Sequence, residues 1–84
     1  MSKKEKLIKR LKMRPADFTI SELETLLDGF GYMRQDKGRT SGSRIIYICD
    51  DHPPIMLHRP HPGNELKRYQ INQVIDLFEQ EGLI

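Results

Sequence analysis

The fold is decided by residues 44–58, which read Arg-Ile-Ile-Tyr-Ile-Cys, then Asp-Asp-His-Pro, then Pro-Ile-Met-Leu-His. The first six are rich in β-branched and aromatic side chains, which favour a strand. Residues 50–53 have turn chemistry, so residues 54–58 are predicted to return as a second strand. The resulting hairpin pairs Cys49 with Pro54, Tyr47 with Met56 and Ile45 with His58.

A third strand and two helices are predicted ahead of this hairpin. Residues 32–36 form a short strand, joined to residue 44 by a loop of small and basic residues. Residues 3–13 place Leu7, Ile8 and Leu11 on one helical stripe, which Pro15 ends.

The second helix has clear signals at both ends. Thr19-x-x-Glu22 is a capping box, and Phe18 before it can pack on Leu23 as a hydrophobic staple. Glycines at positions 29 and 31 offer a stop. A last helix follows residue 66, because apolar residues recur at the helical spacing and Gly82 can end it; these residues are Ile71, Val74, Ile75 and Phe78.

The order helix, helix, three strands, helix predicts a small α+β domain with its helices on one face of an antiparallel sheet. The 84 residues allow one domain, with residues 1–14 as a basic arm and residues 19–84 as the core. The single cysteine excludes an internal disulfide and suits a reducing cytoplasm. No apolar run approaches the length of a membrane span or a signal peptide, so we expect no membrane contact.

Charge is distributed unevenly along the chain. Residues 1–14 have a net charge of +6 and residues 30–70 a net charge of +3. Residues 15–29 and the last fourteen residues are acidic, with net charges of −4 and −3. This segregation suits a domain that offers one positive face to phosphate groups.

The predicted hairpin brings the candidate functional residues together at one end of the sheet. It carries His58, and His61 within the rigid corner Pro60-His61-Pro62-Gly63, back beside Gly42-Ser43-Arg44. A guanidinium can bind phosphate, and imidazole can move a proton near neutral pH.

A zinc site is the competing interpretation, because Cys49 and the histidines at positions 52, 58 and 61 lie close in sequence. The hairpin argues against it. Cys49 and His52 lie at one end of the ladder and His58 at the other, more than ~10 Å away at ~3.3 Å per residue. Ligands of one zinc ion each lie ~2.0–2.3 Å from the metal.

One set of short motifs is spread across most of the chain: Gly31-Tyr32, Gly42-Ser43, His61-Pro62-Gly63-Asn64-Glu65-Leu66-Lys67, and a final helix that ends at Gly82-Leu83. With these motifs, residues 19–84 resemble the HicA toxin family. It implies a double-stranded-RNA-binding-domain-like fold and cleavage of mRNA without a metal or other cofactor. It also implies a HicB-like antitoxin as the protein partner.

One position departs from the family pattern. Members have a His directly after Gly-Ser, where this chain has Arg44. Arginine stays protonated at pH 7 and cannot act as a base, but it can hold a phosphate. Catalysis is therefore assigned to His61 and His58, and phosphate or RNA binding to Arg44, Ser43, Lys37, Arg39 and Lys67.

Three functions stay open on the sequence: a metal-independent endoribonuclease toxin, a non-catalytic RNA-binding module of the same fold, and a protein-interaction domain. Three roles also stay open for residues 1–14. They form a helix packed on the domain, extend the RNA footprint, or mediate self-association.

Overall fold

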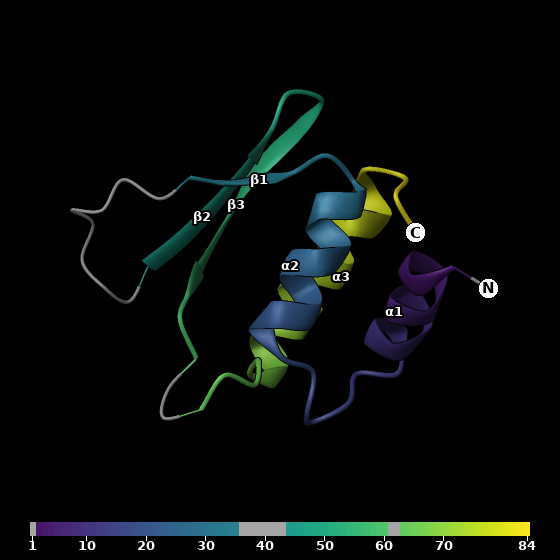
Figure 1. Ribbon diagram of the computed structural model, residues 1–84, viewed down its shortest axis with the longest axis vertical. Coiled ribbons are helices and arrows are strands. Elements are labelled where there is room, and N and C mark those ends of the chain that lie inside the picture. The colour runs from purple at the N-terminus through teal and green to yellow at the C-terminus, as the bar shows by residue number, and fades with distance from the viewer. Residues whose placement is uncertain (1, 36–43, 61–62) are drawn as a thin grey trace.

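Two helices cover one face of a three-stranded antiparallel sheet, and a third helix packs against them on the side away from the sheet (Figure 1). The computed structural model describes residues 2–35, 44–60 and 63–84. In the order β1-β2-β3, the sheet confirms the predicted α+β class, with the double-stranded-RNA-binding-domain-like arrangement. The elements are α1 (Lys3–Lys12), α2 (Ile20–Gly29), β1 (Met33–Gln35), β2 (Arg44–Cys49), β3 (His52–His58) and α3 (Arg68–Gln80).

The core lies between the sheet and the helices. Alternate residues of β2 and β3 point toward α2 and α3, as the period of a strand requires. The opposite face of the sheet, called the open face, carries the exposed side chains of Met33, Ile48 and Met56. The buried side chains are Ile45, Tyr47, Ile55 and Leu57 of the sheet, Leu7 and Leu11 of α1, Leu23, Leu26 and Leu27 of α2, and Ile71, Val74, Ile75 and Phe78 of α3.

Of the three glycines predicted to stop helices, Gly29 is the last residue of α2, and Gly31 and Gly82 are left-handed. Gly31 has φ +91°, and the amide of Tyr32 donates to the carbonyl of Leu27 at 3.0 Å. Gly82 has φ +72°, and the amide of Leu83 donates to the carbonyl of Phe78 at 2.8 Å. These bonds satisfy carbonyls that a helix end leaves free, and a side chain would strain the backbone at either glycine.

The predicted register of the hairpin is wrong by one residue. Ile45 pairs with Leu57 and Tyr47 with Ile55, so His58 lies opposite Arg44. The cause is a tighter turn, because Cys49 pairs with His52 across Asp50-Asp51. β3 therefore begins at His52 rather than at Pro54, and it tolerates its two prolines because an edge strand has amides that need no partner.

The other strand and helix boundaries differ less from the predictions. The predicted strand 32–36 is observed as Met33–Gln35, and Asp36 lies outside the described residues. The predicted helix 3–13 ends at Lys12, with Met13 as its cap.

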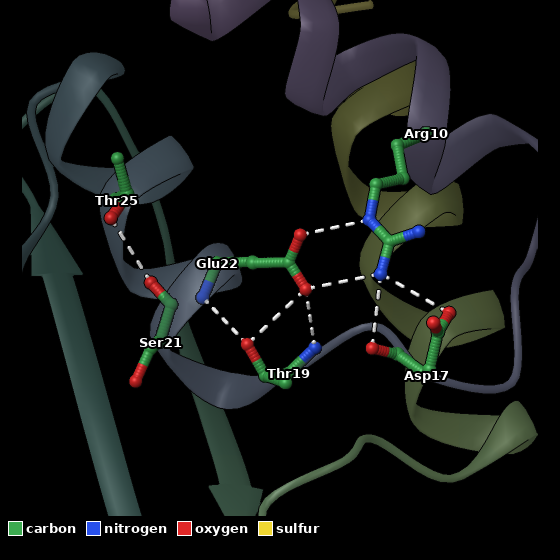
Figure 2. Close-up of polar contacts among 6 residues, drawn as sticks. All are labelled: Arg10, Asp17, Thr19, Ser21, Glu22 and Thr25. Atoms are coloured by element: carbon green, nitrogen blue, oxygen red, sulfur yellow. Dashed lines mark hydrogen bonds and ion pairs between the residues drawn. The ribbon is translucent and has the colours of Figure 1, made fainter.

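An ion-pair network joins α1 to the start of α2 (Figure 2). The Nε of Arg10 donates to Glu22 at 2.8 Å, and its Nη2 donates to the carbonyl and the carboxylate of Asp17 at 3.0 and 3.1 Å. Glu22 also completes the predicted capping box, because its carboxylate accepts the amide of Thr19 at 3.0 Å. The hydrogen bond from Arg10 lowers the pKa of Glu22. One carboxylate therefore caps α2 and anchors α1.

Truncation of α1's buried face tests whether this helix is part of the domain. Leu11 is fully buried, so Leu11→Ala is expected to lower the free energy of unfolding by about 2–5 kcal/mol, the usual range for a leucine cavity. Met13 is 80% exposed, so Met13→Ala is the apolar control and should change little. Urea unfolding of both variants measures the difference. Equal effects would contradict the packing of α1.

The contact of α2 with the sheet predicts a pH dependence. Tyr47 is buried and its hydroxyl donates to Glu24 at 2.8 Å. Burial, followed by this hydrogen bond to Glu24, raises the pKa of Tyr47. Because the folded state resists loss of this proton, the stabilisation is complete below the ordinary tyrosine pKa of ~10 and is lost as pH rises above it.

Tyr47→Phe removes this ionisation from both states. We expect the free energy of unfolding of the wild type to fall more steeply than that of Tyr47→Phe as the pH passes ~10, the ordinary tyrosine pKa. Chemical denaturation over this pH range measures both slopes. The lysines that titrate in the same pH range are common to both proteins, so their effect cancels in the comparison. Parallel curves would therefore contradict a contribution of Tyr47 to the pH dependence.

Candidate functional site

The candidate site lies at the end of the sheet where β2 begins and β3 ends. Arg44 and His58 are direct partners in the antiparallel ladder. Their neighbours Ile45 and Leu57 point into the core, so Arg44 and His58 project from the open face, and both are exposed. Side chains at paired positions have Cβ atoms ~4.5–5.5 Å apart, so these two can contact one ligand.

The segment that follows β3 is attached to α2 rather than left free. The amide of Ile20 donates to the carbonyl of Asn64, and the amide of Leu66 donates to the carbonyl of Phe18, both at 2.8 Å. Pro60 and Leu66 are buried at its two ends. The residues on either side of positions 61 and 62 are therefore held in place.

Gln70, on the first turn of α3, connects this segment to the sheet. Its side chain is 2% exposed, and its oxygen accepts the amide of Lys67 at 2.9 Å while its Nε2 donates to the carbonyl of His58 at 2.8 Å. Both ends of the amide are thus satisfied, as a buried polar group requires. Gln70 therefore fixes the start of α3 against the backbone of His58, one of the two candidate catalytic histidines.

The sequence interpretation missed Gln70. A signal was available, because Lys67-x-x-Gln70 has the spacing of a helix cap with a glutamine that accepts the cap amide. Its second partner, the carbonyl of His58, depends on how the chain returns to α3 and has no local signature.

Arg59 and Arg34 are two further cations at this end of the sheet, and the sequence interpretation did not single them out. They line a hollow of about 460 Å³ whose other walls include Ile20, Ile45 and Asn64. Arg34 is partly neutralised, because its Nη1 lies 3.4 Å from a carboxylate oxygen of Glu24. Arg59 is exposed and forms no ion pair among the described residues. The charge beside His58 is therefore positive on both faces of the sheet.

The structure brings together three of the predicted site residues: Arg44, His58 and Lys67. Lys67 is exposed and is the N-cap residue of α3, and its predicted contact with phosphate stays a prediction. The other four, Lys37, Arg39, Ser43 and His61, lie outside the described residues, and their roles stay predictions.

Cys49 and His52 lie at the opposite end of the hairpin. The Nδ1 of His52 lies 2.9 Å from a carboxylate oxygen of Glu81, and its ring lies 6.3 Å from that of Tyr32. His52 therefore joins the hairpin turn to the end of α3. Over residues 2–35, 44–60 and 63–84 no group of three potential metal ligands occurs, and no helix is long and apolar enough to cross a membrane.

Comparison with known proteins gives one match. The family model for the HicA toxin of bacterial toxin-antitoxin matches residues 20–83. Neither the curated proteins nor the solved structures contain a match to this chain. The matched region begins at the first residue of α2 and includes the whole candidate site, while α1 lies outside it.

Substitutions of Gln70 test its two contacts separately. Gln70→Leu loses both bonds and is expected to cost about 1–3 kcal/mol for the unsatisfied backbone groups. Gln70→Glu can still accept the amide of Lys67 but, when ionised, opposes the carbonyl of His58. A protonated carboxyl can donate to that carbonyl, so the folded state raises the pKa of the new side chain.

The sign of the pH effect follows from this raised pKa. Relative to the wild type, Gln70→Glu is expected to be destabilised near neutral pH and to recover as pH falls toward ~4, the ordinary glutamate range, whereas Gln70→Leu does not recover. Thermal unfolding across this range measures both differences. A constant difference for Gln70→Glu would contradict the contact with His58.

Proposed function

This chain belongs to the HicA toxin family, and from that premise we propose that it is the toxin of a toxin–antitoxin pair and cleaves RNA without a metal ion. The observation that carries the proposal is the pairing of Arg44 with His58 on the open face of the sheet. It places a permanent cation beside a group that can exchange a proton near neutral pH. These are the two functions that phosphodiester cleavage by an internal hydroxyl requires.

In the proposed reaction the ribose 2′-oxygen attacks the adjacent phosphorus. His58 or His61 takes the proton from the 2′-hydroxyl, and the bond from phosphorus to the 5′-oxygen breaks. The leaving 5′-oxygen takes a proton from the other imidazole or from water. The products are a 2′,3′-cyclic phosphate and a 5′-hydroxyl, so no oxidant, reductant or metal is consumed.

Positive charge holds the reacting phosphate in this proposal. Arg44 can bind two of its oxygens through the guanidinium fork and stabilise the charge that develops during attack. The side chain of Gln70 links the backbone of Lys67 to that of His58, and we assign Lys67 to a neighbouring phosphate. Ser43, Lys37 and Arg39, which precede β2 in the sequence, complete the proposed RNA contacts.

Membership of a toxin family implies a cognate antitoxin. We propose that the antitoxin is HicB-like, that it covers the end of the sheet carrying Arg44 and His58, and that the pair acts in the cytoplasm, where mRNA is found.

A second candidate function rests on the same residue. Arg44 occupies the position where the family pattern has its histidine, and it cannot act as a base. A protein that kept the phosphate contacts without this proton acceptor would bind RNA and leave it intact. Such binding would weaken steeply with salt and would follow RNA shape more than sequence.

A cleavage assay on labelled single-stranded RNA in the presence of EDTA separates the two functions. We expect cleavage with cyclic-phosphate or 3′-phosphate ends. His58→Ala combined with His61→Ala should slow it about 10²–10⁴-fold, the usual contribution of general acid–base catalysis. Arg44→His, which restores the family pattern, should not abolish it.

The third histidine is the matched control. His52 contacts Glu81 at the far end of the hairpin, so His52→Gln should leave the cleavage rate unchanged. Intact RNA that is nevertheless retained in a gel shift at low salt would favour the binding module. Cleavage unaffected by the loss of both His58 and His61 would contradict the catalytic assignment.

A further inference from the structure

Arg14 has a backbone conformation that is unusual for its residue type. It follows the cap of α1 and has φ +50°, where helices usually place glycine. Its side chain is not free, because Nε donates to Oδ1 of Asn72 on α3 at 2.8 Å. A residue held in a strained conformation, with its side chain fixed against another element, points to a role for that side chain.

A second arginine faces the same place. Arg68, the first residue of α3, lines a hollow of about 320 Å³ together with Arg14. Its apolar walls are Pro15, Ala16, Leu66 and Ile71. Both arginines are exposed, and neither forms an ion pair in the described part of the chain.

The nearest acidic residue in the α1–α2 connection is already engaged. Asp17 accepts from Arg10 at 3.1 Å, as Figure 2 shows, and the first turn of α3 contains no acidic residue. Glu65, three residues before Arg68, forms no ion pair with either arginine in the described part of the chain, so the charge of Arg14 and Arg68 is available to an outside anion.

The backbone next to Arg68 is connected to the candidate site through the side chain of Gln70. Arg68 follows Lys67 in the sequence. The Gln70 side chain accepts a hydrogen bond from the amide of Lys67 and donates one to the carbonyl of His58. His58 in turn pairs with Arg44. Cations therefore continue along one end of the molecule, where Figure 1 shows the α1–α2 connection and the start of α3 next to the segment that follows β3.

We propose that Arg14 and Arg68 bind phosphates of the RNA strand beyond the cleavage site, so that the α1–α3 junction lengthens the RNA-binding surface of the family core. This inference rests on the proposed function. A row of cations suits an anion with repeating phosphates, and guanidinium groups bind phosphate bidentately. The proposal also selects among the three roles left open for residues 1–14. The buried Leu7 and Leu11 pack this segment on the domain, and Arg14 at its end extends the RNA-binding surface.

The test compares two charge-removing variants of equal size. Arg14→Gln with Arg68→Gln removes the proposed contacts. Lys3→Gln with Lys6→Gln removes two exposed charges from the opposite end of α1. Each protein is titrated, over a range of salt concentrations, with a short single-stranded RNA that spans only the cleavage site and with a longer one. Thermal unfolding confirms that the variants fold.

For the longer RNA, the arginine variant should lower the slope of log affinity against log salt by about 1.4, because each lost phosphate contact on a single strand contributes ~0.7. The short RNA and the lysine variant should show little change. Arg68→Lys alone, which keeps the charge, should retain most of the wild-type slope.

Two results would overturn the inference: equal slopes for the two double variants, or an arginine effect of the same size on the short RNA. Loss of binding to an acidic antitoxin with unchanged RNA binding would also overturn it. Failure of the proposed function has a different signature, because the wild type itself would then neither retain nor cleave the longer RNA at low salt.

Discussion

The buried amide of Gln70 is the contact on which the candidate site depends. It is 2% exposed, and it joins the carbonyl of His58 at the end of β3 to the amide of Lys67 at the start of α3. The loss of either partner would leave a buried polar group without a hydrogen bond, which is more unfavourable than the bond itself is favourable. The amide therefore fixes the distance between the exposed end of the sheet and the cationic start of a helix. Arg44, across the ladder from His58, and Lys67 lie on opposite sides of this connection.

A second constraint links the family core to the segment outside it. Glu22 is part of the matched region and caps α2, but the same carboxylate accepts the guanidinium of Arg10 on α1. Because the pair is only partly exposed, it is less screened by water than a surface ion pair. With Leu11 buried beneath it, α1 has a fixed orientation, which in turn determines where Arg14 emerges beside α3. The additional helix thus has a defined position relative to the site.

Local sequence patterns predicted most of the fold. The capping box at Thr19, the glycines at positions 31 and 82, and the limits of β2 depend on residues close in sequence, and all are confirmed. The hairpin register was wrong because His52 and Pro53 were assigned to the turn, although they belong to β3, an edge strand that accepts proline. The site was predicted in part: the pairing of strands placed His58 near Arg44, but the roles of Gln70 and Arg14 arise from contacts between distant segments. Such contacts depend on the path of the connections, which periodicity does not encode.

In the proposed function, Arg44 at the position where the family pattern has a histidine divides phosphate binding and proton transfer between two strands. A histidine at the start of β2 could both hold a phosphate and accept a proton, but only within the pH range where it titrates. Arg44 keeps its charge at every physiological pH, so phosphate binding no longer competes with proton transfer at that position. In the proposed reaction we assign proton transfer to the opposite strand, where His58 lies across the ladder with its backbone held by Gln70. With an arginine rather than a base at the start of β2, the proposed reaction depends on the placement of β3, which carries His58.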